Sequence, residues 1–287
     1  GAVGALLTDP RVQAVGFVGS SAIAEYIYAT GCAHGKRVQC FGGAKNHMIV
    51  MPDADMDQAV DALVGAGYGS AGERCMAVSV AVPVGQKTAD ALMKKLVPRV
   101  ESLKIGPSTD DKADYGPMVT KAHMNKVRDY VDIGVKEGAK LVVDGRNFKL
   151  QGYENGNFMG GCLFDNVTKD MRIYKEEIFG PVLSVVRSKS FDEAIGLVND
   201  HAYGNGTAIF TRDGDAARTF ANNVKIGMVG INVGVPATMA MFPFAGWDES
   251  FFGDLHLQGR EGIQFYTRQK VVSTRWLGGD AADVWRK

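Results

Sequence analysis

One cysteine of the chain stands in a setting that suits covalent chemistry. Cys75 directly follows Arg74, and the segment 72–77 lies where an apolar, glycine-rich helical pattern ends. The thiolate is the reactive form of cysteine, and a neighbouring cation favours it by lowering the thiol pKa. Cys75 is therefore a candidate nucleophile for attack on a carbonyl carbon. The alternative is a structural cysteine, because free cysteines are among the most buried residues.

Composition and charge exclude several classes of function. The 287 residues are 46% hydrophobic and 22% charged, as in ordinary globular proteins, and suffice for about two domains. Acidic and basic side chains number 32 each, so there is no basic excess for binding nucleic acid or an anionic membrane. No stretch has the length and apolarity of a membrane span, and no secretory signal is recognisable.

Neither the cysteines nor the histidines are spaced as metal ligands. No C-x-x-C pair is present, so we expect neither a zinc site nor a disulfide framework, and a reducing compartment fits. The three cysteines other than Cys75 lie in apolar contexts and are expected in the core: Cys32, Cys40 and Cys162. The five histidines share no H-x-x-x-H spacing and are expected to be structural or solvated.

Strand-like and helix-like patterns alternate along most of the chain, which predicts an α/β fold with a largely parallel sheet. Apolar runs predict strands at 12–18, 36–41, 47–51, 77–84, 182–186, 207–210 and 228–233. Amphipathic patterns predict helices at 22–30, 55–64, 89–103, 121–137, 191–199 and 215–223. Ser20 or Ser21 is expected to cap the first helix. Segment 262–276 lacks a helical period and is expected to form an extended arm that pairs with another subunit.

Three more segments place turn glycines beside polar residues. Segment 17–20 (FVGS) leads from a strand into a helix, where backbone N–H groups can bind phosphate. Segment 41–46 (FGGAKN) is a glycine turn before a strand, and segment 175–182 (KEEIFGPV) places two glutamates before a Gly-Pro turn. In this order, together with 72–77, they resemble the aldehyde dehydrogenase superfamily from the first residue to about Trp276. The most specific signatures are EIFGP at 177–181, GPM at 116–118 and PFAG at 243–246.

Within that superfamily the chain is most similar to the CoA-acylating branch, the methylmalonate-semialdehyde dehydrogenases. The similarity lies in GAKNH at 43–47, GERCMA at 72–77, YENGNF at 153–158 and YGNGTAIF at 203–210. Because family members carry an N-terminal half before this point, the chain is expected to be the C-terminal part of a family chain. The resemblance implies the remnant of a Rossmann-like NAD-binding domain at 1–45, a catalytic domain with a parallel-sheet core at 46–243, and a C-terminal segment with an oligomerisation arm at 244–287.

The resemblance also implies roles for individual residues. Cys75 would be the nucleophile, and Arg74 would hold the substrate carboxylate through paired hydrogen bonds. The residues implied in NAD binding are Glu177 at the ribose beside nicotinamide, Phe179 at the ring, and Gly19 and Ser20 at the pyrophosphate. Lys45 would support the cofactor site. The alternatives are an exposed ion pair between Arg74 and Glu73, and solvated charges at Glu177 and Lys45.

One departure from the family pattern bears on the reaction. Hydrolytic aldehyde dehydrogenases have a water-activating glutamate at the position of Phe41, and phenylalanine cannot accept a proton. A Cys75 thioester would therefore persist until coenzyme A arrives. The expected reaction is oxidative decarboxylation of methylmalonate or malonate semialdehyde to propionyl-CoA or acetyl-CoA with reduction of NAD. The alternatives are a hydrolytic NAD(P)-dependent aldehyde dehydrogenase, a truncated inactive chain that persists as an association module, and a cysteine esterase.

The resemblance carries expectations for the cellular setting as well. It implies a homo-oligomer, dimer or tetramer, that acts in valine catabolism. The compartment would be the cytoplasm, or the mitochondrial matrix in a eukaryote. The expected partners are a small semialdehyde, NAD and coenzyme A, with no nucleic acid, membrane or metal.

Overall fold

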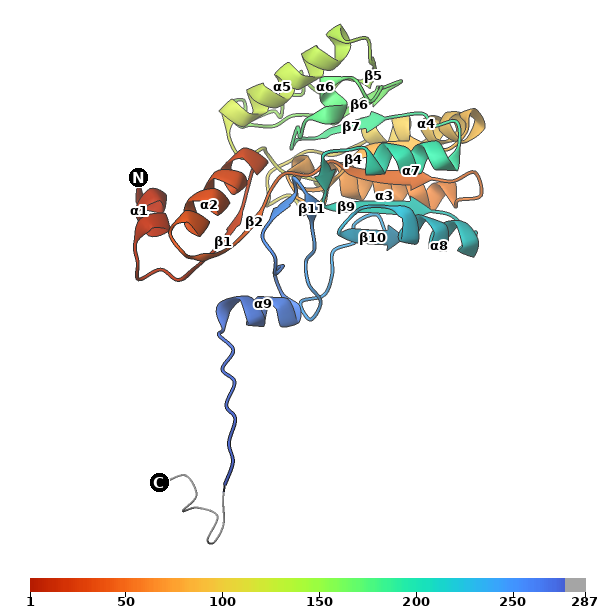
Figure 1. Ribbon diagram of the computed structural model, residues 1–287. Helices are drawn as coiled ribbons and strands as arrows, with labels where there is room; N and C mark the ends of the chain where they lie inside the picture. The colour runs from red at the N-terminus through yellow and green to blue at the C-terminus, as the bar shows by residue number, and fades with distance from the viewer. Residues whose placement is uncertain (277–287) are drawn as a thin grey trace, which may run out of the picture.

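A twisted seven-stranded sheet forms the centre of the computed structural model, which describes residues 1–276 (Figure 1). The strand order is β10-β9-β3-β4-β7-β6-β5. Every neighbouring pair is parallel except the edge pair β5–β6, which is antiparallel. The strands are β3 (Asn46–Val50), β4 (Val78–Pro83), β5 (Lys140–Val143), β6 (Cys162–Asp165), β7 (Val182–Val185), β9 (Gly206–Phe210) and β10 (Met228–Ile231). The predicted α/β fold with a parallel-sheet core is confirmed.

Helices connect and cover these strands, as parallel connections require. They are α3 (Met56–Tyr68), α4 (Gln86–Glu101), α5 (Lys121–Lys136), α6 (Arg172–Lys175), α7 (Phe191–Asn199) and α8 (Gly214–Asn223). The side chains of Asp55, Thr120, Ser190 and Asp213 cap α3, α5, α7 and α8 by accepting backbone N–H groups. None of the helices within 1–276 is long and apolar enough to cross a lipid bilayer.

The N-terminal residues form a small separate sheet. Strands β1 (Ala14–Val18) and β2 (Arg37–Phe41) pair in parallel through helix α2 (Ser21–Ala33), and β12 (Phe251–Phe252) pairs antiparallel with β2. Helix α1 (Ala2–Thr8) packs on α2, and β11 (Trp247–Asp248) pairs with β8 (Tyr203–Gly204). Ser20 occupies the N-cap of α2 as expected, but its side chain makes no capping hydrogen bond, so the expectation is confirmed for the position alone.

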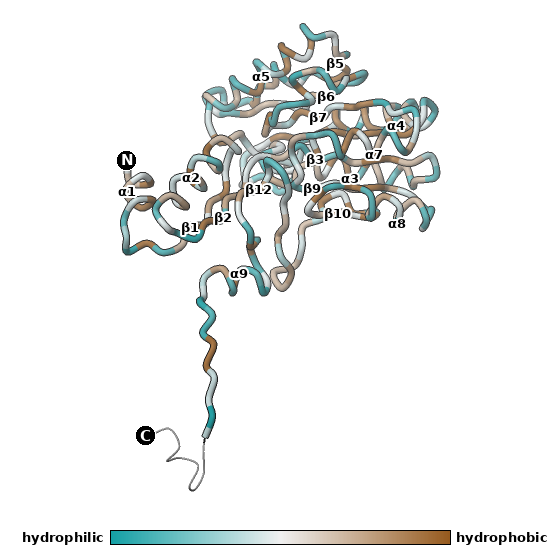
Figure 2. The backbone as a smooth tube through the Cα atoms, in the orientation of Figure 1, coloured by the Kyte–Doolittle hydropathy of each residue, from teal (hydrophilic) through white to brown (hydrophobic). Residues whose placement is uncertain are grey.

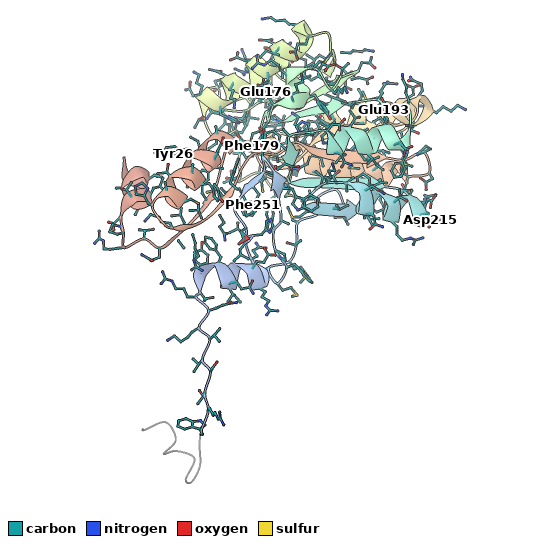
Figure 3. All side chains as sticks on the ribbon, in the orientation of Figure 1. Tyr26, Glu176, Phe179, Glu193, Asp215 and Phe251 are labelled. Carbon is teal, nitrogen blue, oxygen red and sulfur yellow. The ribbon has the colours of Figure 1, made fainter. Side chains whose placement is uncertain are left out.

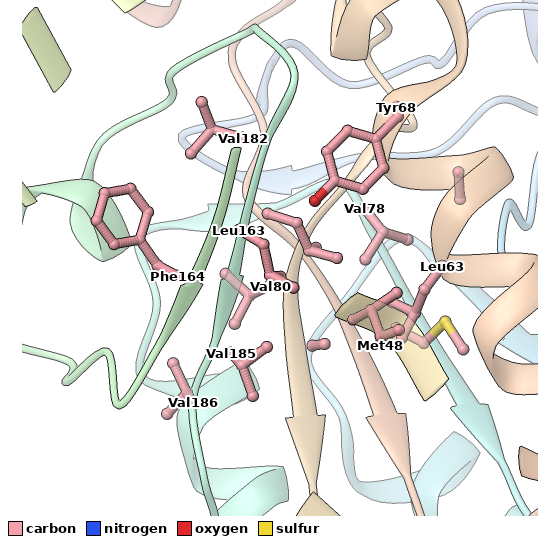
Figure 4. Close-up of a cluster of buried hydrophobic side chains, with 14 of the residues drawn as sticks. Met48, Leu63, Tyr68, Val78, Val80, Leu163, Phe164, Val182, Val185 and Val186 are labelled. Carbon is pink, nitrogen blue, oxygen red and sulfur yellow. The ribbon is translucent and has the colours of Figure 1, made fainter. Parts of the chain in front are cut away.

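The core lies between the large sheet and its helices. Figure 4 shows Leu63 and Tyr68 of α3 beside Met48 and Val80 of the central strands. Strands β3 and β9 are buried along their whole length, as in sheets covered on both faces. Strand β6, which the sequence pattern did not reveal, is also fully buried.

Two of the three cysteines expected in the core are there. Cys40 and Cys162 are buried, whereas Cys32 is exposed. The buried residues of α2 are Ala24, Ile27 and Gly31, so Cys32 lies beside the helical stripe that faces the core and not within it.

The expected extended arm is partly wrong. Residues 262–266 belong to helix α9 (Gly259–Tyr266), because Phe265 is buried and anchors the segment. The guanidinium of Arg37 donates to the carbonyl oxygens of Gln264 and Thr267, which supplies partners for the end of this helix. Residues 267–276 have neither helix nor strand, and Figure 2 shows them projecting from the body of the chain.

Candidate active site

Cys75 follows a tight turn between α3 and β4. The turn, Gly69–Gly72, contains Ser70, Ala71 and Gly72 in succession with φ of +54°, +56° and +69°, a left-handed conformation that is rare outside glycine. A Cβ atom at Gly72 would lie 2.1 Å from the carbonyl oxygen of Gly180. The glycine therefore lets the cysteine loop touch the backbone of segment 177–181, and Cys75 itself is exposed.

Four of the six predicted site residues line one small cavity. Cys75, Arg74, Glu177 and Phe179 share it with Lys45, although they come from separate parts of the chain. Gly19 and Ser20 are not among its lining residues. Gly19 donates its N–H to the carbonyl oxygen of Phe41, and Ser20 is exposed at the start of α2.

The Cys75 thiol does not have the lowered pKa that its neighbour suggested. Burial raises its pKa, the Glu177 carboxylate raises it further, and hydrogen bonds from the N–H groups of Cys75 and Met76 partly offset the increase. Arg74 contributes no shift, and its Nε donates to Ser70 Oγ at 3.1 Å. The expected activation of the sulfur by Arg74 is therefore wrong: sequence adjacency did not place the guanidinium against the thiol.

Arg74 and Glu73 do not form the alternative ion pair. Glu73 accepts the N–H of Val119 at 3.1 Å, and its carboxylate lies 3.5 Å from Nε2 of His123. Arg74 lines the same cavity as Cys75, and its side chain is exposed. A guanidinium in this position can reach an anionic group beside Cys75.

Glu177 is fixed by the glycine turn at the end of β2. Its Oε1 accepts the N–H of Ala44 at 2.9 Å, and a Cβ at Gly43 would lie 2.8 Å from its Oε2. Ser21 Oγ accepts the N–H of Gly43 at 2.9 Å and donates to the carbonyl oxygen of Glu249. Burial raises the pKa of Glu177, so the interpretation as a freely solvated charge is wrong.

Lys45 is buried beneath the same turn. Its Nζ donates to the carbonyl oxygens of Ile173 and Glu176 at 2.7 and 2.8 Å. Burial lowers its pKa to about 7, against the opposing effect of the two glutamates that follow Lys175. The alternative of a solvated Lys45 is therefore excluded. The ammonium group instead fixes the backbone that precedes Glu177.

Phe179 has an unusual backbone for a bulky residue. Its φ is +57°, the residue is 37% exposed, and its carbonyl oxygen accepts Nε2–H of His123 at 2.6 Å. Figure 3 places Phe179 where the small and large sheets meet. His123 is thus a residue of the site that the sequence did not single out, because its partners come from 50 or more residues away.

Phe41 lies outside the Cys75 cavity. Its ring is buried against Phe251 and Phe244, with centroids 4.7 and 5.7 Å apart, and also faces His256. Phe41, the last residue of β2, therefore contributes apolar packing and no base. Within residues 1–276, no three His, Cys, Asp or Glu side chains gather as metal ligands do.

The fold, the cysteine turn and the glutamate segment define the class of protein. The profile of the aldehyde dehydrogenase family matches residues 1–272, and the chain belongs to this family. It is 60% identical over 275 residues to a malonate-semialdehyde dehydrogenase of Pseudomonas aeruginosa, covering 96% of this chain and 55% of that protein. A second malonate-semialdehyde dehydrogenase, from Halalkalibacterium halodurans, is 53% identical over 96% of this chain and 56% of its own.

Solved structures agree with this assignment. A methylmalonate-semialdehyde dehydrogenase from Oceanimonas doudoroffii superposes with a TM-score of 0.96 at 55% identity, covering 98% of this chain and 58% of that one. A Sinorhizobium meliloti protein complexed with NAD gives 0.96 at 63% identity, covering 98% and 57%. The chain spans about half the length of the curated relatives it matches.

Proposed function

We propose that the protein carrying this chain is a CoA-acylating, NAD-dependent dehydrogenase of malonate or methylmalonate semialdehyde, with Cys75 as nucleophile. The observation that carries the proposal is the shared cavity of Cys75, Arg74, Glu177 and Phe179. The names of the relatives support the substrate class, and the NAD complex of a structural neighbour supports the cofactor.

The first step uses the sulfur and the backbone. Cys75 loses its proton and Sγ bonds to the aldehyde carbon, which leaves an oxyanion on the former carbonyl oxygen. The backbone N–H of Cys75 is the donor proposed for this oxyanion, and one such donor is typically worth about 3 kcal/mol. Bound NAD would supply the acceptor for the hydride of that carbon, which would leave the acyl group on the sulfur of Cys75 as a thioester.

Arg74 and the cavity wall supply binding. The substrate is an anion whose carboxylate lies two bonds from the reacting carbon, and a guanidinium binds a carboxylate through two parallel hydrogen bonds. Glu177 and the exposed side chain of Phe179, which line the same cavity, fit a ribose and a flat ring. The uncapped N-terminus of the 13-residue helix α2, at Ser20, fits a phosphate group.

Acyl transfer completes the cycle. The thiol of coenzyme A attacks the thioester carbon, the bond to Cys75 breaks, and the cysteine recovers its proton. The substrate carboxylate lies β to the thioester carbonyl, so it can leave as carbon dioxide; the electron pair of the broken bond passes to the thioester as an enolate, which then takes a proton from water. Phe41 is buried in an aromatic cluster and offers no base for water, which supports transfer to a thiol over hydrolysis.

The test uses the protein expressed from its full reading frame. It is incubated with semialdehyde and NAD, with or without coenzyme A, while NADH absorbance and intact mass are followed. We expect a single NADH burst and a stable acyl adduct on Cys75 without coenzyme A, and steady turnover with it. Cys75→Ser should abolish both signals, and Cys32→Ser, which changes the other exposed cysteine, should leave them unchanged. Steady release of free acid without coenzyme A would favour the hydrolytic alternative, and the absence of NADH and adduct would favour an inactive module.

A further inference from the structure

Two asparagine side chains converge on the backbone of the nucleophile. Nδ2 of Asn46, at the start of β3, donates to the carbonyl oxygen of Cys75 at 2.9 Å. Nδ2 of Asn205, between β8 and β9, donates to the same oxygen at 2.8 Å. Both asparagines are buried, with 4% and 5% of their surface exposed. A buried amide that served packing alone could be apolar, so their convergence on one carbonyl calls for a reason.

The two amides belong to one network. Asn46 Nδ2 also donates to the carbonyl oxygen of Ala77, and its Oδ1 accepts the backbone N–H of Gly206 at 3.0 Å. Asn205 Nδ2 lies 3.5 Å from Oδ1 of Asn46 and 3.1 Å from the sulfur of Met76. The backbone on either side of Met76 is thereby tied to two neighbouring strands of the large sheet, β3 and β9.

Peptide geometry transmits this restraint to the sulfur. A trans peptide is planar and points its C=O and N–H in opposite directions. Because the carbonyl of Cys75 is fixed toward the asparagines, the N–H of Met76 in the same plane is fixed on the other side. The N–H groups of Met76 and Cys75 partly offset the rise that burial causes in the thiol pKa. Hydrogen bonds to the carbonyl also strengthen the N–H as a donor.

We infer that Asn46 and Asn205 are positioning residues, which hold the Cys75–Met76 peptide in one orientation and thereby set the place of its N–H relative to the sulfur of the nucleophile. The inference rests on the proposed function, in which Cys75 attacks an aldehyde. It assigns the sheet a task that Arg74 does not perform, since the guanidinium bonds to Ser70 and is not among the groups that shift the thiol pKa. The asparagines touch neither substrate nor cofactor in this account and act through the backbone.

The experiment measures the sulfur itself. The rate of iodoacetamide alkylation is followed from pH 6 to 10 by peptide mass spectrometry in the wild type and in Asn205→Leu, which keeps the volume and removes the donor. Exposed Cys32 is the internal reference. We expect the apparent pKa of Cys75 to rise by about half a unit to one unit, and its rate at pH 7.5 to fall about 3- to 10-fold, the effect of one lost hydrogen bond. The rate for Cys32 should not change.

A matched variant separates positioning from stability. Asn199→Leu also removes an asparagine that donates to a backbone carbonyl, that of Asn223, and it should leave the alkylation of Cys75 unchanged. If Asn205→Leu unfolds, buried Cys40 and Cys162 will react in native buffer; Asn46→Ala, which removes the other donor to the Cys75 carbonyl, then replaces it. An unchanged pKa and rate for Cys75 in a folded variant would overturn the inference. Because alkylation needs no turnover, this result is independent of whether the dehydrogenase reaction is observed.

Discussion

Nε2 of His123 donates to the carbonyl oxygen of Phe179 at 2.6 Å and lies 3.5 Å from the carboxylate of Glu73. One ring on α5 therefore contacts both the loop that precedes Cys75 and the segment that contains Glu177. Phe179 has a positive φ, a strain that persists where surrounding contacts enforce it. The hydrogen bond from His123 is one such contact.

His123→Ala should loosen both segments together. Loss of the ring leaves the Phe179 carbonyl unpaired and leaves Glu73 with the N–H of Val119 as its remaining partner. We expect faster amide hydrogen exchange in 72–77 and 177–181, with a loss of about 1 kcal/mol of stability. Exchange measured by mass spectrometry checks this result. His34→Ala is the control, because His34 is exposed and bonds only to the carbonyl of Thr30 in its own helix. Unchanged exchange in both segments would contradict the role of His123.

Gly72→Ala and Gly65→Ala should change stability in opposite directions. Alanine at Gly72 would need φ of +69° and would place Cβ 2.1 Å from the carbonyl oxygen of Gly180. We expect a loss of about 2–4 kcal/mol in the free energy of unfolding and a displaced Cys75 loop. Gly65 lies exposed in α3 with no atom near its Cβ position, so alanine there should add about 0.5–1 kcal/mol. Urea denaturation measures both, and equal effects would exclude the proposed contact.

Two buried histidines should make the fold sensitive to acid. Burial lowers the pKa of His47 to about 3 and that of His201 to about 4, and both rings contact Tyr174. The unfolded chain takes up these protons near pH 6.5 and the native chain does not, so stability falls as pH drops from 6.5 toward 4. Each histidine contributes at most about 1.4 kcal/mol per pH unit.

His201→Gln tests this dependence. Glutamine can supply a donor and an acceptor but no titration, so the loss of stability between pH 6.5 and 4.5 should be smaller than in the wild type. Urea denaturation at several pH values measures the difference. Exposed His34→Gln should leave the wild-type slope intact. A slope that is the same in His201→Gln and the wild type would show that this ring titrates alike in both states.

Periodicity predicted most of the large sheet because its strands and helices bury regular apolar patterns. Strand β6 was missed because its four residues, Cys162–Asp165, follow a glycine- and asparagine-rich loop and become a strand through pairing with β7 and β5. The sequence pattern also missed helix α9, because the helix depends on the burial of Phe265 and on a hydrogen bond from Arg37, 227 residues away in the chain. In both cases, contacts between distant segments decided the local structure.

The residues of the candidate site could also be predicted from the sequence only in part. Motifs in separate segments identified Cys75, Arg74, Glu177 and Phe179, and the fold brings these four together. Adjacency suggested that Arg74 lowers the thiol pKa, but the turn at Ser70 directs its Nε elsewhere. Hydrogen-bond partners depend on side-chain geometry, which spacing along the chain does not encode.

The buried amine of Lys45 should make stability depend on pH, because it donates to backbone carbonyls and not to a carboxylate. Its pKa of about 7 lies below the usual value near 10.4, so between these values the unfolded chain binds more protons than the native chain. Stability should therefore rise with pH from 7 to 8.5, by about 1.5 kcal/mol from this group. Above that range the raised pKa values of Cys40 and Cys162 oppose the trend, since their thiols ionise first in the unfolded chain.

In Lys45→Met the rise in stability with pH should disappear. The variant should also be less stable at every pH, because the carbonyls of Ile173 and Glu176 lose their donor. Lys95→Met, which changes an exposed lysine paired with Asp57, should retain the rise. Parallel pH profiles for the wild type and Lys45→Met would show that the amine is charged in the native protein throughout this range, and its burial would then need a compensating anion such as Glu177.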